Sequence, residues 1–276
     1  MRSIFWFRRD LRLSDNPALL AAIDAGDEIV PVFILDPSLI GKSGSKRLAY
    51  LGQSLRALDE SLDHKLHVMV GDQVEVLRDL MKRYDASEVH ISEEFEPYGV
   101  ARDKRVEAAG IKLVRTGSPY AVSPGRVRKP SDDTPYKVYT PFYRAWLVHG
   151  WRGPVAAPKN IKAVTPQAGD RNFPDWPLPE GVVITPAGES AAHTRWQKFI
   201  SGALASYDEE RNNAGVDGTS KLSAHLKWGE IHPRTLLAEL NQSKAHDVFR
   251  KEIAWREFYA DVLHNNPHTE SDRSEE

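Results

Sequence analysis

Residues 3–19 read SIFWFRRDLRLSDNPAL, and they give the first sign of the fold. The apolar run Ser3–Phe7 is typical of a strand that is covered on both faces, as the strands of parallel sheets are. Charged residues follow it, and Asn16-Pro17 is a start signal for a helix, because proline is favoured at the first helical position. A buried strand followed by a helix indicates the beginning of a βαβ unit.

The alternation of strand and helix signals continues to about residue 115. Further strands are predicted at 29–35, 66–70, 88–91 and 111–114, and helices at 45–62, 74–84 and 100–109. Units of this length predict a five-stranded parallel sheet of the Rossmann-like α/β class over residues 1–120, with helices on both faces. Ligands of such sheets bind at the carboxyl ends of the strands.

The rest of the chain has a different character, and no strand is predicted after about residue 195. Residues 121–192 are interpreted as an interdomain connector, because twelve of the 18 prolines lie between Pro119 and Pro186 and the segment shows little periodicity. Aromatic residues would anchor it: Tyr136, Tyr139, Phe142, Tyr143 and Trp146. Residues 193–276 are predicted to be all-α, with helices at 196–204, 221–228, 233–240 and 248–263.

The composition excludes several classes of site. The chain has 276 residues and no cysteine, which rules out disulfides, thiolate-bound zinc, iron–sulfur clusters and a catalytic thiol. Its first apolar run ends after five residues, too early for a secretory signal or a membrane span, so we expect a cytoplasmic protein. The net charge is −2, but nine lysines and arginines stand against two aspartates between Arg115 and Lys162. This basic segment fits either a DNA backbone or a solvated loop surface.

Common nucleotide and metal motifs are absent from the sequence. No GxGxxG follows Phe7, and residues 41–46 (GKSGSK) lack the spacing of a phosphate loop. His264 and His268 are four residues apart, but the NNP sequence between them interrupts the helix that would align them. No metal site is therefore predicted.

Three longer motifs occur in order: WFRRDLRLSDNPAL at 6–19, YDEERN…GTSKLS…LKWG at 207–229 and EIAWREFY at 252–259. Together they resemble the photolyase–cryptochrome family, and in particular a class I cyclobutane pyrimidine dimer photolyase. The resemblance covers nearly the whole chain and implies an α/β antenna domain followed by part of an all-α flavin-binding domain. It also implies an activity, the light-driven repair of pyrimidine dimers in DNA by electron transfer from FAD.

The resemblance assigns FAD binding mainly to the second motif. The residues are Tyr207, Thr219, Ser220, Lys221, Leu222, Ser223 and Phe249. Hydroxyls and backbone amides at the start of a helix suit a diphosphate, although Thr219 or Ser220 also fits a plain N-cap. Phe249 stands where the family often has a tryptophan beside the flavin.

The same resemblance implies contacts to DNA that contains pyrimidine dimers. Glu252 and Trp255, the implied catalytic pair, are three residues apart and share one helix face, which should border a cavity. A carboxylate beside a broad aromatic surface suits bases that are turned out of the duplex. Arg211 and Arg256 are the implied phosphate contacts. Helix core is the alternative interpretation of the aromatic residues, and for Phe258 it is the one we favour.

The resemblance further implies a light-collecting antenna chromophore, either 8-hydroxy-5-deazaflavin or 5,10-methenyltetrahydrofolate. The residues that match the family's antenna site are Asp36, Arg47, Glu94, Glu96 and Lys227. They look like the deazaflavin type, which we favour, and Lys227 is the most telling of them. A charged surface is the alternative for each residue taken alone.

The family's flavin domain continues where this chain becomes polar, at residues 270–276 (ESDRSEE), so we interpret the chain as a C-terminally truncated photolyase with impaired repair. The intact family is monomeric, whereas here we expect apolar helix faces without a partner, which favour association. The residues on these faces are Trp196, Phe199, Leu226, Trp228, Leu237, Leu240, Phe258 and Leu263. A cryptochrome-type blue-light receptor and a non-catalytic antenna-binding module are the alternative functions.

Overall fold

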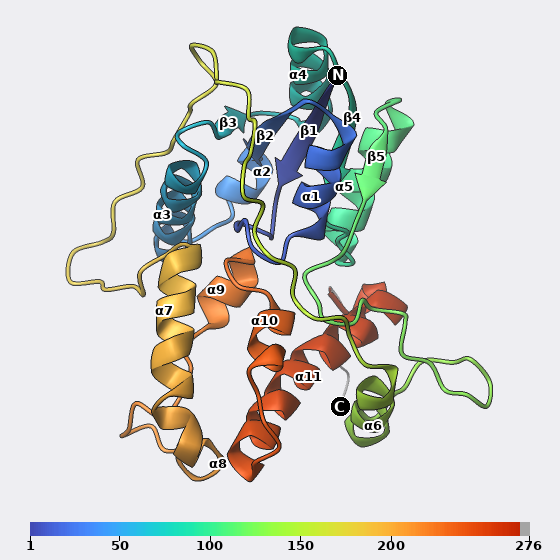
Figure 1. Ribbon diagram of the computed structural model, residues 1–276, viewed down its shortest axis with the longest axis vertical. Coiled ribbons are helices and arrows are strands. Elements are labelled where there is room, and N and C mark those ends of the chain that lie inside the picture. Colours follow the sequence, from blue (N-terminus) through green and yellow to red (C-terminus); the bar gives the residue numbers. More distant parts are fainter. Residues whose placement is uncertain (271–276) are drawn as a thin grey trace.

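The structure is a computed structural model that describes residues 1–270, with an α/β half and a helical half (Figure 1). The α/β half contains β1 (Arg2–Phe7), α1 (Pro17–Ala25), β2 (Glu28–Leu35), α2 (Pro37–Ile40), α3 (Ser45–Ser61), β3 (His67–Val70), α4 (Gln73–Tyr84), β4 (Ala86–Ile91), α5 (Pro97–Ala108) and β5 (Leu113–Arg115). The remainder contains α6 (Tyr139–His149), α7 (Glu189–Ile200), η1 (Ala203–Ser206), α8 (Tyr207–Glu210), α9 (Ser223–Trp228), α10 (Pro233–Ala238), α11 (Lys244–Asn265) and η2 (Pro267–Glu270). Most of the polar stretch, residues 271–276, lies outside the described residues.

The five strands form one parallel sheet in the order β3-β2-β1-β4-β5. The predicted α/β fold is therefore confirmed, with each strand within two residues of its expected bounds. Side chains of β1 alternate between the two faces: Phe5 and Phe7 pack with α1 and α3, whereas Ile4 and Trp6 pack with α4 and α5. The chain leaves β1 towards β2 on one side and returns to β4 on the other, so a crevice opens at their carboxyl ends.

Side-chain caps begin two of the helices that flank the sheet, α1 and α4. Asn16 accepts a hydrogen bond from the backbone N–H of Leu19, and Pro17 is the first residue of α1, as the sequence predicts. Asp72 caps α4 through the N–H of Val74 in the same manner. The loops that lead from strand to helix are thereby held in one conformation, which matters because they border the candidate site.

The connector contains a helix that the sequence analysis did not predict. Its residues Tyr139, Phe142, Tyr143 and Trp146 have the spacing of a helix face, and the last three are buried against α11. The prolines around α6 obscure this pattern, but Pro141 lies in the first turn, where proline needs no hydrogen-bond partner. No strand follows β5 within residues 1–270, as expected.

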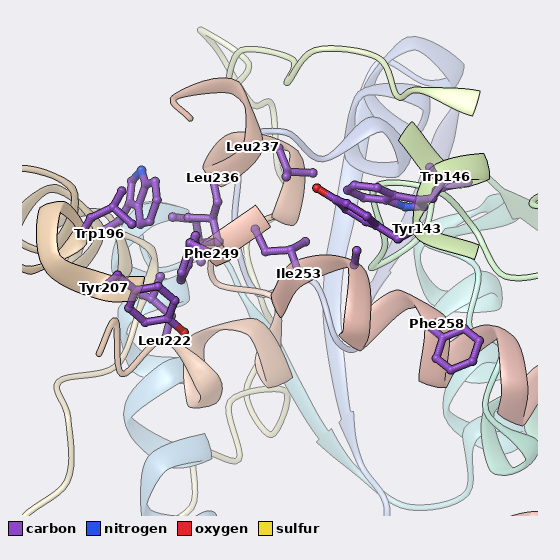
Figure 2. Packing of buried hydrophobic residues seen from close by; sticks show 14 of the residues in the cluster. Tyr143, Trp146, Trp196, Tyr207, Leu222, Leu236, Leu237, Phe249, Ile253 and Phe258 are labelled. Atoms are coloured by element: carbon purple, nitrogen blue, oxygen red, sulfur yellow. The ribbon is translucent and has the colours of Figure 1, made fainter. Parts of the chain in front are cut away.

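The prediction of unpartnered apolar faces is wrong for the residues named. Trp196, Phe199, Leu237 and Phe258 are buried, and the other four residues are half-buried rather than exposed. Phe258 packs against Phe142 of α6, whereas Trp196 and Phe199 pack against Phe249 of α11, and all of these side chains belong to one core (Figure 2). Trp228 packs instead on the core of the α/β half. No helix in the described residues is long and apolar enough to cross a membrane.

Candidate functional site

A cavity of about 330 Å³ lies at the carboxyl edge of the sheet, beside the ends of β1, β2 and β4. We call it the antenna cavity, because Asp36, Glu94, Glu96 and Lys227 line it, four of the five residues predicted for the antenna chromophore. Arg47, the fifth, is exposed on α3 and does not line it. Apolar side chains from the ends of β1 and β2, from α2 and from α9 make up much of the remaining wall. The volume lies in the range of small-molecule sites.

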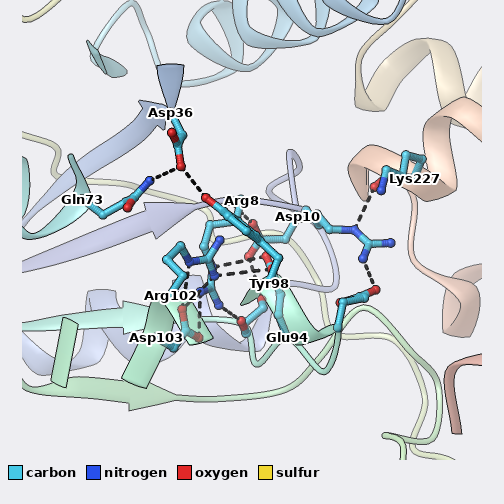
Figure 3. Close-up of polar contacts among 12 residues, drawn as sticks. Arg8, Asp10, Asp36, Gln73, Glu94, Tyr98, Arg102, Asp103 and Lys227 are labelled. Atoms are coloured by element: carbon cyan, nitrogen blue, oxygen red, sulfur yellow. Dashed lines mark hydrogen bonds and ion pairs between the residues drawn. The ribbon is translucent and has the colours of Figure 1, made fainter. Parts of the chain in front are cut away.

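A buried ion network supports the antenna cavity (Figure 3). Arg8 lies 2.7 Å from Asp103 and 3.5 Å from Glu94. Arg102 pairs with the same two carboxylates, at 2.8 Å and 3.4 Å, and both guanidinium groups lie over the ring of Trp6. Each buried charge therefore has opposite partners, which buried charges need. The network holds Glu94 in position.

Asp36 lies at the end of β2 and faces three donors. It accepts hydrogen bonds from the hydroxyl of Tyr98, from Gln73 at 2.8 Å and from the backbone N–H of Ser38 at 2.8 Å. Partial burial opposes its ionisation, but these bonds outweigh burial and hold the pKa of Asp36 at about 2. The carboxylate is thus ionised and fixed in orientation.

Glu96 offers the antenna cavity an unsatisfied acceptor. Its Oε1 pairs with Arg9 and accepts a hydrogen bond from Tyr120 at 2.9 Å, whereas its Oε2 is buried without a partner among the described residues. Burial would raise the pKa of Glu96, but the charge of Arg9 and the hydrogen bonds to the carboxylate together outweigh burial and lower it. A buried acceptor without a donor costs free energy, so a ligand hydroxyl or ring N–H would be favoured there. The residues therefore fit a polar-edged chromophore.

The first motif also joins the two halves of the protein. Arg234, at the start of α10, lies 2.7 Å from Asp15, and both side chains are buried. Arg12 donates to the backbone carbonyls of Gly229 and Asp15, each at 2.8 Å. His232 lies between them, 3.1 Å from Asp15. These contacts of Arg12 and Asp15 form a buried seam between the two halves.

A second buried cluster lies at the same seam. The hydroxyl of Tyr50 donates to Glu230 at 2.6 Å, and Nδ1 of His225 lies 2.6 Å from the same oxygen. The other oxygen of Glu230 accepts from the backbone N–H of Gly188 at 2.7 Å. This carboxylate thus ties α3, the connector and α9 together.

The residues assigned to FAD lie together at one end of the helical half. Tyr207 and Phe249 are buried and their rings are 5.4 Å apart, with Leu222 in the same core. Above them, Thr219, Lys221 and Ser223 are exposed. Neither Thr219 nor Ser220 is an N-cap, because α9 begins at Ser223 and the residue before it is Leu222. The hydroxyls form an open surface rather than a cavity.

Three of the four residues assigned to DNA contact lie near one another. Arg211 and Glu252 form an ion pair, each about one third exposed, with side-chain exposures of 31% and 36%. The ring of Trp255 stacks on Tyr139, with centroids 3.6 Å apart, so Tyr139 covers one of its faces. Arg256 is directed elsewhere, towards the α/β half, where it lies 4.6 Å from the Tyr120 ring centroid. Neither Glu252 nor Trp255 borders the antenna cavity.

Comparison with known proteins decides the family. A family model described as DNA photolyase matches residues 3–160, more than half of the chain. The chain belongs to the DNA photolyase family. A deoxyribodipyrimidine photo-lyase of Agrobacterium fabrum is 36% identical over 96% of this chain and 59% of its own length. The crystal structure of a bacterial class III photolyase from Agrobacterium tumefaciens superposes with a TM-score of 0.86 at 33% identity, over 99% of this chain and 61% of that one.

The chain therefore spans about 60% of the length of these photolyases. A relative of its own length also exists: an uncharacterised 31.6 kDa protein of Synechococcus sp. strain PCC 6716 is 34% identical over 92% of this chain and 98% of its own length. The class I assignment made from the motifs stays a prediction, since the similar solved structure is described as class III.

Sequence reasoning missed several residues of the antenna cavity in this photolyase-family chain. Gln73 and Tyr98 bind Asp36, and Arg102 stabilises Glu94, but none of the three was assigned to the site. Two of them could have been predicted from their positions in the sequence. Gln73 and Tyr98 follow the carboxyl ends of β3 and β4, where ligands of parallel sheets bind. Within residues 1–270 no group of side chains is suited to hold a metal ion.

Proposed function

We propose that this chain forms the light-collecting part of a deoxyribodipyrimidine photo-lyase, an enzyme that repairs cyclobutane pyrimidine dimers in DNA under light. In this proposal residues 1–120 are the antenna domain, 121–192 the connector and 193–276 part of the helical flavin domain. The observation that carries it is the antenna cavity, which gathers four of the predicted antenna residues at the carboxyl edge of the sheet. Membership of the DNA photolyase family supports the activity.

The proposed antenna chromophore is 8-hydroxy-5-deazaflavin rather than 5,10-methenyltetrahydrofolate. The cavity combines an apolar wall with charges of both signs, such as Asp36 and Lys227, which suits a planar ring with a polar edge. The free oxygen of Glu96 would accept a hydrogen bond from that edge. Lys227 supports the deazaflavin because it supplies a cation from the helical half.

FAD is proposed to bind over Tyr207 and Phe249, with the hydroxyls of Thr219, Ser220 and Ser223 towards its diphosphate. When bound and reduced, FAD supplies the electron that splits the dimer, and this chemistry belongs to the cofactor. The chain itself contributes the buried rings of Tyr207 and Phe249 and the largely exposed polar loop at residues 219–223.

The proposed DNA contacts are Glu252, Trp255, Arg211 and Arg256. A DNA phosphate at Arg211 would compete with Glu252, because the two side chains are paired in the structure. Stacking of a base on Trp255 would use the face that Tyr139 does not cover. Arg256 would have to leave its place over Tyr120, so we expect it to contribute least.

A second candidate function is a non-catalytic antenna-binding module. It is favoured by one contrast: four of the five antenna residues line a cavity, whereas Thr219 and Ser223, which are assigned to the FAD diphosphate, are exposed. A cryptochrome-type light receptor remains a further proposal that has the same two cofactor sites.

Reconstitution with chromophores tests the antenna proposal. The purified chain is mixed with the deazaflavin, the folate or FAD, freed of unbound ligand and examined by absorption spectroscopy. We expect retention of the deazaflavin, loss of most of it in Lys227→Met, and full retention in Lys104→Met, which removes an exposed lysine of α5. Retention of no chromophore, or equal loss in both variants, would contradict the assignment.

Binding to DNA tests the repair function separately. If Trp255 stacks on a flipped base, Trp255→Ala removes about 1–3 kcal/mol, and affinity for dimer-containing DNA falls about five- to 150-fold. Affinity for undamaged DNA should hardly change, which serves as the internal control. If the wild-type chain does not distinguish dimer-containing from undamaged DNA, the antenna-module function is preferred.

A further inference from the structure

A second cavity, of about 670 Å³, lies between the carboxyl ends of β4 and β5 and the segments that flank α6. Glu93 and Phe95 follow β4, Ser118 follows β5, and Trp151 and Arg152 follow α6. It shares no lining residue with the antenna cavity. None of the residues assigned to FAD or DNA lines it either, so it is outside the function proposed above.

The lining of this second cavity carries uncompensated positive charge. Arg126, Arg152 and Arg234 line it, and Glu93 is the single acidic residue among the lining residues. Arg234 is neutralised by Asp15, at 2.7 Å. The side chains of Arg126 and Arg152 are exposed, and neither guanidinium forms an ion pair or hydrogen bond within residues 1–270.

The surroundings of Arg152 support this description. The guanidinium is exposed at the surface but partly desolvated, and this partial burial lowers the pKa of Arg152; repulsion from Arg234 lowers it further, and attraction to Asp15 only partly opposes this. The charged form of Arg152 is therefore held at a cost in free energy, which an anion beside it would offset. Arginine is also the residue best suited to bind phosphate, because its planar guanidinium donates two parallel hydrogen bonds.

Aromatic side chains form another part of the same wall. Trp151 packs at a tilt against the buried Trp146, with ring centroids 4.3 Å apart, and this contact supports its ring. Phe95 and Tyr120 line the cavity as well, and their rings are 6.4 Å apart. The hydroxyls of Ser118 and Ser123, 2.9 Å apart, add polar groups. Rigid rings beside free arginines suit a ligand with a planar ring and an anionic group.

We propose that the second cavity binds an aromatic phosphomonoester, a small molecule with one planar base and one phosphate, with the phosphate on Arg126 and Arg152 and the ring beside Trp151. The site is separate from the antenna cavity and independent of dimer repair. It also accounts for part of the excess of basic residues between Arg115 and Lys162.

Isothermal titration calorimetry on the full chain tests this proposal with adenosine 5′-monophosphate as the probe. Adenosine and inorganic phosphate are titrated in parallel, and we expect each to bind at least about tenfold more weakly than the monophosphate. Arg126→Gln and Arg152→Gln should each weaken the monophosphate about tenfold to a hundredfold. Both arginines are exposed and unpaired, so these variants should keep the fold, which circular dichroism checks.

Two control variants make the outcome decisive. Arg144→Gln removes an exposed arginine of α6 that lies outside the second cavity, and Lys227→Gln removes a cation of the antenna cavity. Both should leave affinity for the monophosphate unchanged. If Arg144→Gln weakened the affinity for the monophosphate as much as the cavity variants, binding would depend on the overall positive charge of the surface. If Lys227→Gln weakened it, the ligand would lie in the antenna cavity. Either result overturns the proposal. The proposal is also overturned if the wild-type chain binds a single-stranded oligonucleotide but no mononucleotide, or if it binds neither.

Discussion

At the scale of single residues, Gly229 lies where the backbones of the two halves are in direct contact. This glycine ends α9 with φ +66°, and a Cβ added to it would lie 1.9 Å from the carbonyl oxygen of Arg9. The backbone N–H of Leu11 donates to the carbonyl of Trp228 at 3.0 Å beside it. Two backbones can approach this closely only where a side chain is missing.

We therefore predict that Gly229→Ala destabilises the protein by about 3 kcal/mol or more. Gly181→Ala is the matched control, because Gly181 has nearly the same φ, +71°, but open space around its Cβ position. The free energy that Gly181→Ala costs should come only from placing alanine in the left-handed conformation, about 1–2 kcal/mol. Urea unfolding of both variants measures the difference. Equal costs would mean that the contact with Arg9 relaxes freely.

His232 gives the seam a dependence on pH. Its Nδ1 accepts the N-cap hydrogen bond of α10 from Arg234 N–H, and its Nε2 lies 2.9 Å from the carbonyl of Ser118, so it is held in the neutral form. Burial lowers the pKa of His232 from 6.5 to about 3. Since the unfolded chain then binds more protons, this contribution to stability is complete above pH 6.5 and is lost as pH falls towards 3.

The predicted outcome concerns the slope of unfolding free energy against pH. Between pH 6.5 and 4, His232→Asn should reduce this slope by up to about 1.4 kcal/mol per pH unit, because one protonation is removed. Asparagine keeps an acceptor for the N-cap bond. Urea unfolding at several pH values provides the measurement. A variant with the wild-type slope would show that His232 does not titrate in this window.

At the scale of elements, α6 marks the limit of what the sequence predicted. The strands were found because apolar runs between turn signals have few other interpretations. α6 was missed because its surroundings are rich in proline, although its aromatic residues have helical spacing. The antenna residues matched a pattern and came together in space, whereas the partners of Asp36 and Glu94 come from distant segments that no local pattern connects. The burial of Phe258 was missed together with α6, whereas Trp196 and Phe199 are buried by Phe249, a contact between predicted helices that no local pattern connects.

Glu257 fastens α6 to α11 and to the start of the connector. Its carboxylate accepts hydrogen bonds from Trp146 Nε1 at 2.7 Å and from the backbone N–H groups of Ala121 and Val122. Burial raises its pKa and these donors only partly oppose that. The three donors require two acceptor oxygens, which glutamine does not have.

Glu257→Gln should therefore destabilise the protein by about 1–3 kcal/mol at pH 7, the cost of a buried donor without an acceptor. Glu60→Gln, on the exposed side of α3, should be nearly neutral. Tryptophan fluorescence during urea unfolding follows both variants, since Trp146 is a direct partner. If Glu257→Gln left the urea midpoint unchanged, the free energy gained by removing a buried charge would equal the free energy lost with the hydrogen bond.

At the scale of the whole molecule, the seam makes two halves of different architecture one cooperative unit. The pair Asp15–Arg234 lies at its centre with both side chains buried. Removal of one partner should cost about 3–5 kcal/mol, since the other charge is left buried. Asp15→Asn and Arg234→Gln together should cost less than the sum of the two changes.

Calorimetry of the single and double variants provides this measurement, and a second readout concerns cooperativity. The wild type should unfold in one transition, and Arg234→Gln should separate the melting of the sheet from that of the helices. Additive costs, or a single transition in every variant, would show that the pair does not couple the halves.

The antenna cavity has one wall from each half, since Arg9 and Glu96 face Lys227 and Trp228 across the seam. A chromophore that contacts both walls binds the protein only when its two halves are packed against each other, and not when they are separated. By mass action, a ligand at 100 times its dissociation constant would add about 2.7 kcal/mol to docking. The reciprocal effect follows, because whatever loosens the seam weakens the chromophore by the same factor. Release of the chromophore is then a direct report of how firmly the sheet and the helices are joined.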